Sequence, residues 1–253
     1  MATKTEPDSN KMDYGVVVFL DALGTRGIWK GGDVEKVMIR WESFVEEIEK
    51  YGKKSTKEEG IKFTFNAFSD TMILTFSKNS EIKENLLEVA SRMIGSCITI
   101  GMTFGINLRG SISIGYFSHS DKMIIGPGID EAAGYYSNDD WIGVSVTPSL
   151  YSFLERIAEG NDIAFIPHFV KYDVPRKNGK EIGGWAIGLN WNLDITSFKM
   201  ENEMKGCKTI KDIAHHQLEK TTEPAGSRKW KNTLDFFYYL KSKKYYDLKD
   251  IKE

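Results

Sequence analysis

Two aspartates, Asp21 and Asp70, have the sequence surroundings that best suit chemistry. Asp21 follows the apolar run 14–20 (YGVVVFL), which is typical of a strand buried on both faces, and Asp70 follows Ser69 between two strand-like runs. Two neighbouring carboxylates repel each other unless divalent cations lie between them. Mg²⁺ commonly takes one or two carboxylates from the protein and further ligands from substrate phosphates. We therefore predict that Asp21 and Asp70 hold two divalent metal ions, Mg²⁺ or Mn²⁺, for a polyphosphate substrate.

The segment after Asp21 adds a candidate phosphate contact. Gly24 lets the backbone approach a ligand closely, so the N–H groups from Leu23 to Arg26 are expected to face phosphate. An ordinary structural role is the alternative for each acid, because Asp is favoured in turns. The two acids together with Gly24 favour the metal–triphosphate interpretation.

The elements that must position these acids follow from the spacing of apolar residues. Apolar runs predict strands at 14–20, 61–67, 72–76, 108–116, 124–125, 144–146, 169–174 and 185–191. Helical spacing predicts helices at 34–48 with Asp33 as N-cap, at 81–103, from about 130, and at 148–160 after the N-cap Thr147. The charged, glycine-bounded segment 50–60 is expected to be a loop, and 21–25 a polar turn.

The order β-α-ββ-α-β, followed by β-α-β-α-ββ, predicts an α+β fold. Its first half is the split ferredoxin-like arrangement, a mostly antiparallel sheet with helices on one face. In that arrangement the first strand lies beside the second strand of the 61–76 hairpin, so Asp21 and Asp70 are expected to meet. We expect a flexible tail at 1–13, a catalytic domain at 14–195 and a charged, helical C-terminal extension at 196–253.

Composition excludes several classes of protein. The chain of 253 residues has a net charge of −2 and a pI of about 6.2, which argues against a bulk nucleic-acid binder. Its two cysteines cannot form a disulfide framework or a four-thiolate zinc site. The polar N-terminus is not a signal peptide, and the continuous apolar runs fall well short of a membrane span. We expect a soluble, cytoplasmic protein.

Four ordered motifs resemble those of the class III nucleotidyl cyclases. The segments 19–25 (FLDALGT) and 68–70 (FSD) are similar to the two metal-binding motifs of that family. The segment 108–115 (LRGSISIG) resembles the family strand R-x-G-I-x-x-G, with the glycine one place early. The segment 126–133 (GPGIDEAA) resembles the helix start G-x-x-V-N-x-A-(A/S). The resemblance covers about residues 14–195 and implies the ferredoxin-like cyclase fold.

Within that family the chain is most similar to the pyrimidine cyclases of the bacterial Pycsar antiphage system. It is short and without a sensor domain, and it carries Val174-Pro175, Trp191 and a helical tail with 232–234 (NTL). The resemblance implies conversion of UTP or CTP to 3′,5′-cyclic UMP or CMP plus pyrophosphate, with UTP slightly favoured. It also implies second-messenger synthesis in antiphage defence, with a separate effector protein that responds to the cyclic nucleotide.

The resemblance implies roles for the metal-binding segment. Asp21 and Asp70 would hold both metals, with the Ala22 carbonyl as a further ligand. The backbone N–H groups of Thr25 and Arg26 would cradle the β- and γ-phosphates.

Two further positions follow from the resemblance. Arg109 matches the family arginine that pairs with the triphosphate, a role that suits a planar guanidinium; a solvated charge at a strand edge is the alternative. Asn66, four residues before Asp70, occupies the base-reading position and matches neither the purine nor the pyrimidine pattern there. Its amide offers a donor and an acceptor, so it can pair with a uracil or a cytosine edge. An ordinary strand residue near a turn is the alternative for Asn66.

Two positions depart from the family pattern. The transition-state asparagine falls on Asp130, a substrate-binding candidate, and the arginine four residues later falls on Gly134. An ionised acid cannot donate a hydrogen bond to the developing negative charge. The remaining candidates for that role are Tyr135, Tyr136 and the basic residues of the second hairpin, Lys171, Arg176 and Lys177.

The active site of this family forms between two chains, so the resemblance implies a head-to-tail homodimer with two sites. Direct contact with nucleic acid or membrane is not expected. A purine cyclase is the alternative among enzymes. A catalytically silent nucleotide-binding module is the alternative of another class, favoured by Asp130 and Gly134 but disfavoured by the intact metal acids. A polymerase palm shares the paired acids but needs a basic channel and a longer chain.

Overall fold

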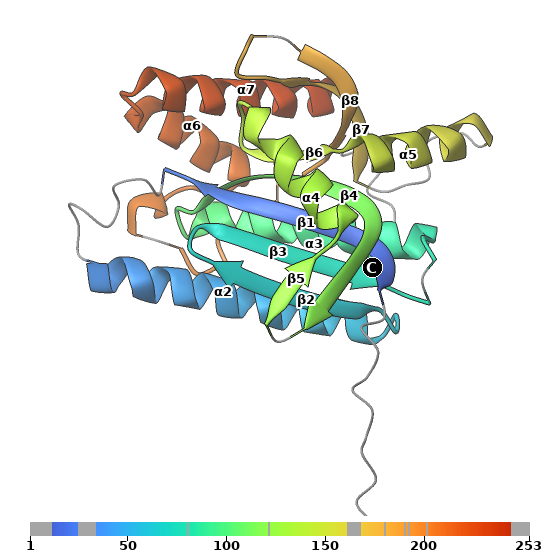
Figure 1. Ribbon diagram of the computed structural model, residues 1–253. Coiled ribbons are helices and arrows are strands. Elements are labelled where there is room, and N and C mark those ends of the chain that lie inside the picture. The colour runs from blue at the N-terminus through green and yellow to red at the C-terminus, as the bar shows by residue number, and fades with distance from the viewer. Residues whose placement is uncertain are drawn as a thin grey trace, which may run out of the picture.

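The computed structural model describes residues 12–24, 34–79, 81–120, 122–160, 168–179, 181–189, 191, 193–200 and 202–243. Figure 1 shows a central sheet with helices packed against it. Most of the predicted tail and the predicted N-cap Asp33 lie outside the described residues, as do the substrate-binding candidates Thr25 and Arg26.

One mixed sheet joins the described strands in the order β2-β3-β1-β4-β6-β8-β7, with β5 paired to β4. β4 and β6 are parallel, and the other pairings are antiparallel. The strands are β1 (Asp13–Leu23), β2 (Lys62–Phe68), β3 (Thr71–Ser77), β4 (Asn107–Ser120), β5 (Met123–Ile125), β6 (Gly143–Val146), β7 (Phe169–Pro175) and β8 (Glu181–Ile187). The order β2-β3-β1-β4 is that of a ferredoxin-like sheet, so the predicted fold class and the predicted neighbours of the first strand are confirmed.

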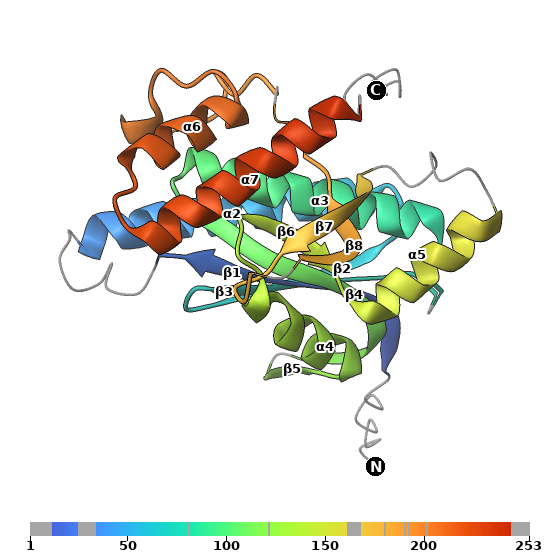
Figure 2. The same cartoon turned by 90° about the horizontal axis from the view of Figure 1, so that it is seen from above.

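Helices cover both faces of this sheet. α2 (Val34–Lys57) and α3 (Glu84–Thr103) pack on one face, and α6 (Ile210–Lys220) and α7 (Pro224–Ser242) join the same core (Figure 2). α4 (Pro127–Tyr135) covers the other face, against β1 and β4. α5 (Pro148–Gly160) follows β6 and ends where the sequence predicts. The helical extension is therefore part of the main core, while α4 forms a second, smaller layer.

Side chains of β1 alternate between these two layers, as a pleated strand requires. Val18 and Leu20 are fully buried in the core with α2 and α3. Val17 and Phe19 face α4 instead. Asp21 continues this second set, so its carboxylate belongs to the α4 face at the end of the strand.

The predicted loop at 50–60 is wrong, because α2 continues to Lys57. Gly52 is buried, and a Cβ there would lie 2.4 Å from the ring of Phe63. The glycine thus lets the helix approach β2 closely instead of ending the helix. The hydroxyl of Thr56 donates to the carbonyl of Gly52 at 2.8 Å, which satisfies a polar group on the buried side.

The predicted polar turn at 21–25 is also wrong for its first residues. β1 runs on to Leu23, and residues 21–23 pair in register with 107–109 of β4. Other boundaries shift as well: α4 begins at Pro127, three residues early, β4 runs on to Ser120 instead of 116, and β8 lies at Glu181–Ile187 instead of 185–191. Pairing with β4 decided where β1 ends, and local composition does not show that boundary.

α3 is the helix in the described part of the chain that could span a membrane by length and composition. It has 20 residues and a mean hydropathy of 1.2, and 78% of that stretch is buried inside the structure. Cys97 lies fully buried on it, and burial raises the pKa of its thiol. The hydropathy of α3 is accounted for by its place between α2, α6 and the sheet.

The close contact of β1 with β4 generates a stability prediction at Gly110. A Cβ there would lie 2.2 Å from the carbonyl oxygen of Phe19 and 2.6 Å from Leu20 Cδ2. Gly110→Ala is expected to lower the free energy of unfolding by about 3 kcal/mol, measured by urea unfolding. In Gly134→Ala the new methyl meets nothing within 4 Å, and we expect a gain of up to about 1 kcal/mol. Equal stability of the two variants would contradict the prediction.

Candidate functional site

The two predicted metal acids lie at one edge of the sheet. Asp21 is paired in register with Thr71, the first residue of β3, and Asp70 precedes Thr71 in the hairpin turn. The N–H of Ala22 donates to the carbonyl of Asp70 at 2.8 Å, which ties the hairpin turn to the end of β1. Ser69 takes up a left-handed conformation, φ 56°, to make this tight turn. The strand order thus brings together two acids that are 49 residues apart in the sequence.

Arg109 lies opposite Asp21 on the neighbouring strand β4. Its Nη2 donates to Asp21 Oδ2 at 3.0 Å, and Nη1 donates to the carbonyl of Asp139 at 2.9 Å. The guanidinium side chain is 8% exposed and that of Asp21 is 18% exposed. Among the described residues no group accepts a bond from the buried Nε of Arg109. The arginine is therefore held in place by Asp21 and by the carbonyl of Asp139.

Tyr136, a predicted candidate, completes this side of the site. It follows α4, and its ring stacks on Phe19 with the centroids 5.1 Å apart. The guanidinium carbon of Arg109 lies 5.2 Å from the centroid of the same ring, a cation–π distance. Burial raises the pKa of the Tyr136 phenol, and the charge of Asp21 raises it further. The phenol thus stays protonated and can donate a hydrogen bond.

The two acids are close enough for the charge of Asp70 to affect the pKa of Asp21. Burial is the largest cause of the raised pKa of Asp21, and the charge of Asp70 adds to it. The hydrogen bond and the charge of Arg109 act in the opposite direction. A carboxylate that is half-buried and close to a second acid favours a nearby cation.

The donor set fits hard divalent cations. Oδ2 of Asp21 accepts from Arg109, and among the described residues Oδ1 has no hydrogen-bond donor. Carboxylate and carbonyl oxygens of Asp21, Asp70 and Ala22 are the ligand type that Mg²⁺ and Mn²⁺ prefer. The described residues contain no cluster of three or more His, Cys, Asp or Glu side chains suited to a metal. The protein would therefore supply only part of a coordination sphere, and a ligand the rest.

The predicted phosphate-binding turn is described only in part. Leu23 is the last residue of β1 and pairs with Asn107. Gly24 is exposed and has a positive φ of 82°, the conformation in which glycine is favoured. The predicted roles of Thr25 and Arg26 stay predictions, because both residues lie outside the described part of the chain.

Asn66 lies on the α4 face of β2, where it pairs with Ile73 of β3. Ile73 packs against the small cluster beneath α4, so Asn66 shares its side of the sheet with Asp21. The Nδ2 of Asn66 is buried, and within the described residues it donates to no acceptor. A buried amide donor without a protein acceptor is expected to find one in a ligand or in water.

The structure does not bring Asp130 to the metal acids of its own chain. Asp130 lies in the first turn of α4 and is exposed. Gly134 is exposed on the same helix. No hydrogen bond or ion pair of the described residues joins Asp130 to Asp21, Asp70 or Arg109.

The structure separates the three basic candidates of the second hairpin. Lys171 donates to Glu155 at 3.1 Å and lies over Trp185, away from the acids. Arg176 forms a buried ion pair with Asp139. Lys177 is the one whose ammonium interacts with Asp21 and Arg109. Lys177 is therefore the hairpin lysine at the candidate site.

Asp139 is the site residue that the sequence analysis missed. Its side chain is fully buried, and it accepts hydrogen bonds from Arg176 and from the hydroxyl of Ser145 at 2.6 Å. Its backbone carbonyl holds Arg109. The pair of acids directly before the apolar segment 141–146 is the only sequence signal, and it resembles an ordinary turn. Asp139 thus connects the position of Arg109 to the β7–β8 hairpin.

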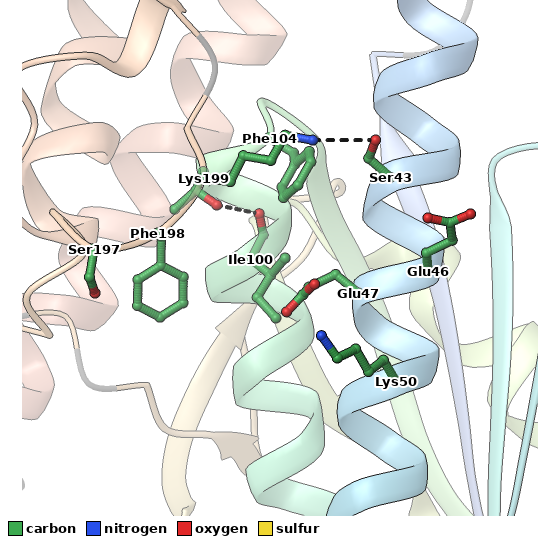
Figure 3. Close-up of a pocket in the computed structure, with 10 residues that line it drawn as sticks. Ser43, Glu46, Glu47, Lys50, Ile100, Phe104, Ser197, Phe198 and Lys199 are labelled. Atoms are coloured by element: carbon green, nitrogen blue, oxygen red, sulfur yellow. Dashed lines mark hydrogen bonds between the residues drawn. The ribbon is translucent and has the colours of Figure 1, made fainter.

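A cavity of about 550 Å³ lies elsewhere, between α2, α3 and residues 197–199 (Figure 3). Lys199 donates to Ser43 at 3.5 Å across it and lies over the ring of Phe104. The cavity is on the α2–α3 side of the sheet, whereas Asp21 faces α4. It contains none of the predicted site residues.

Comparisons with known proteins find similarity of structure. No family model and no curated protein sequence matches the chain. The catalytic core of a rhodopsin-guanylyl cyclase with converted specificity in complex with ATPαS is similar at 14% identity and a TM-score of 0.49, over 70% of this chain and 97% of that one. The guanylate cyclase domain of RhGC from Catenaria anguillulae in complex with GTP is similar at 15% identity and 0.48, over 70% and 98%. The adenylyl cyclase CyaB from P. aeruginosa is similar at 12% identity and 0.48, over 70% and 95%. These identities leave the substrate and the reaction to be argued from the residues of the site.

The buried Asp139 generates a pH prediction. Burial raises its pKa from 3.8 to about 6, against the opposing effects of Arg176 and Ser145. The folded chain therefore binds this proton more tightly than the unfolded chain, and the resulting stability is present below pH 3.8 and is lost as pH rises through 6. Relative to Asp139→Asn, the wild-type free energy of unfolding is expected to fall by about 3 kcal/mol from pH 3.8 to pH 7. Parallel pH profiles of the two proteins in urea unfolding would contradict this.

Proposed function

We propose that this protein is a nucleotide cyclase that converts UTP or CTP to the 3′,5′-cyclic monophosphate and pyrophosphate, with UTP slightly favoured. The observation that carries the proposal is the meeting of Asp21, Asp70 and Arg109 at one sheet edge. These are the residues to which the resemblance to class III cyclases assigns the metals and the triphosphate. A purine cyclase would use the same edge, so the base preference depends on other residues.

The reaction is an intramolecular phosphoryl transfer. The ribose 3′-oxygen attacks the α-phosphorus, the bond from that phosphorus to the β-phosphate oxygen breaks, and pyrophosphate leaves. Two divalent ions held by Asp21, Asp70 and the Ala22 carbonyl would supply charge neutralisation and activation of the hydroxyl. Arg109 supplies a fixed cation for the phosphates, and its restraint by the Asp139 carbonyl lowers the cost of positioning it. Tyr136 contributes a protonated phenol beside that guanidinium.

Asn66 is the proposed base-reading residue. Its buried Nδ2 has no acceptor among the described residues, and its side chain shares the α4 face of the sheet with Asp21. An amide that can rotate presents a donor next to an acceptor, which matches either a uracil or a cytosine edge. The short side chain is consistent with a pyrimidine and does not by itself reject a purine.

A second copy of the chain would complete each site. Asp130 and Gly134 lie on α4 away from the metal acids of their own chain. Large apolar side chains are exposed nearby on β4 and β5: Tyr116 is 52% and Ile125 is 53% exposed. Exposed apolar side chains gathered in one place favour a protein interface. These features support the head-to-tail homodimer.

The proposed cellular role follows from the resemblance alone. The product would act as a cytoplasmic second messenger in antiphage defence, and a separate effector that binds cyclic nucleotides would respond to it. The departures at Asp130 and Gly134 favour one second candidate, a module that binds nucleotide without converting it.

Incubation with each of the four nucleoside triphosphates and Mn²⁺ tests the proposal. We expect a cyclic product from UTP or CTP, identified by mass spectrometry, and loss of turnover by about 10³-fold in Asp70→Asn. Asp235→Asn, an exposed acid on α7, is the matched control and is expected to keep full activity. Product from ATP or GTP alone would contradict the pyrimidine preference. Unchanged turnover in Asp70→Asn would contradict the two-metal site, and nucleotide binding without product would favour the silent module.

Sedimentation equilibrium tests the homodimer. Ile125→Asp places a charge in the exposed apolar group and is expected to weaken dimerisation by at least about tenfold. Tyr151→Asp changes an aromatic residue of α5 that is 39% exposed and should leave the dimer intact. A monomeric wild-type protein at micromolar concentration, or equal effects of both variants, would contradict the expectation.

A further inference from the structure

The C-terminal helix α7 docks on the segment that ends at the candidate site. Asn232 Nδ2 donates to the carbonyl of Asp140 at 2.7 Å, and the N–H of Ile142 donates to the hydroxyl of Thr233 at 2.9 Å. Arg228 forms an ion pair with Asp140, and Lys229 Nζ lies 3.8 Å from Asp140 Oδ1. Positions 228, 229, 232 and 233 share one face of a helix. That face of α7 is therefore fixed against residues 140–142.

The same segment is attached to the end of β7. The N–H of Asp140 donates to the carbonyl of Pro175 at 3.0 Å, and the N–H of Lys177 donates to the carbonyl of Asn138 at 2.9 Å. Lys177 and Lys229 are thus brought to the same segment, one from the second hairpin and one from α7. They are 52 positions apart in the sequence.

Lys177 lies in a cationic environment. Partial burial lowers the pKa of its ammonium most, and the charges of Arg109 and Lys229 lower it further. The charges of Asp140 and Asp21 act in the opposite direction. Among the ion pairs of the described residues none includes Lys177.

Lys229 Nζ also donates to the carbonyl of Ala225 at 3.3 Å, and the acids near the two lysines are shared with arginines. Asp21 is paired with Arg109, and Asp140 is already paired with Arg228. The charge of Lys229 is therefore additional to that of Arg228 at one carboxylate, and Lys177 has no carboxylate of its own in the described part of the chain. Converging like charges destabilise each other unless an anion binds between them. The arrangement favours a compact anion with several negative charges.

We propose that Lys229 of the C-terminal helix joins the hairpin residue Lys177 at the pyrophosphate-binding end of the triphosphate site, so that this helix is part of the substrate site. The identity of the anion rests on the proposed function, since pyrophosphate is the leaving group of that reaction. Lys229 and Lys177 would bind the two terminal phosphates, and Arg109 and the metal acids would lie toward the α-phosphate. The end of β1 lies beside the start of β4, and the segment 138–140 is bonded to the end of β7.

Isothermal titration of the full-length protein with inorganic pyrophosphate and Mg²⁺ tests this proposal without turnover. Lys177→Gln and Lys229→Gln are each expected to weaken pyrophosphate binding by about 5-fold. Lys231→Gln is the matched control, because Lys231 is exposed on the same helix two positions away. It is expected to stay within about 2-fold of wild type. Lys229→Arg, which keeps the charge, is expected to restore most of the affinity.

The outcomes separate this proposal from the proposed reaction. Wild-type affinity in Lys229→Gln, or no pyrophosphate binding by the wild type, overturns the role of Lys229. If Lys229 only held Asp140 in place, Lys229→Gln would lower the melting temperature and leave pyrophosphate affinity unchanged, which also overturns it. Weakened pyrophosphate binding in Lys177→Gln and Lys229→Gln, together with no cyclic product from any triphosphate, supports the anion site and contradicts the cyclase.

Discussion

The ion pair between Asp21 and Arg109 is the interaction on which the rest of the site depends. The two residues lie opposite each other on the central strands β1 and β4, and both side chains are largely buried. Removing either partner leaves an uncompensated charge in a poorly solvated place, which is strongly destabilising. The pair therefore forms only when β1 and β4 keep the register that places the two residues opposite each other. The other charged groups of the site lie around this pair. The backbone hydrogen bond from Ala22 to the carbonyl of Asp70 brings Asp70 next to the pair. The carbonyl of Asp139 accepts a hydrogen bond from Arg109 itself.

Residues 138–142 form the junction that organises the cations. Their backbone is bonded to the end of β7, and they accept side-chain bonds from Arg109 and from α7. Because the buried carboxylates of Asp139 and Asp140 hold Arg176 and Arg228, two guanidiniums are used for structure. Lys177 and Lys229 are attached to the same segment, one through its backbone and one through its ammonium, and these are the cations we propose for the anion. The helical extension thus has a structural and a charge role at once, which its composition of lysines and aromatics does not show.

Much of the site could be anticipated, for identifiable reasons. The hairpin at Asp70 shows in the alternation of residues 61–67, and the burial of β1 shows in an unbroken apolar run. The pairing of β1 with β3 then follows from the ferredoxin-like order. Asn66 was a candidate because the resemblance to class III cyclases places the base-reading residue four positions before Asp70. The structure adds that its Nδ2 is buried and that, in the described part of the chain, it donates to no acceptor.

The sequence by itself determined the element order and the α+β class, because these depend on periodicities of two and 3.6 residues that local residues set. The unbroken apolar run of β1 does not show which face of the strand Asp21 lies on, and the packing of α4 decided it. Tertiary structure decided the length of α2, the end of β1 and the choice of Lys177 over Lys171 and Arg176. It also decided that Asp139 holds Arg109 and that Lys229 lies beside Asp140. Each of these depends on a partner distant in sequence: Phe63 against Gly52, residues 107–109 beside 21–23, and α7 against 140–142. A charge acquires its role from the charges that the fold places around it, and no local pattern contains that information.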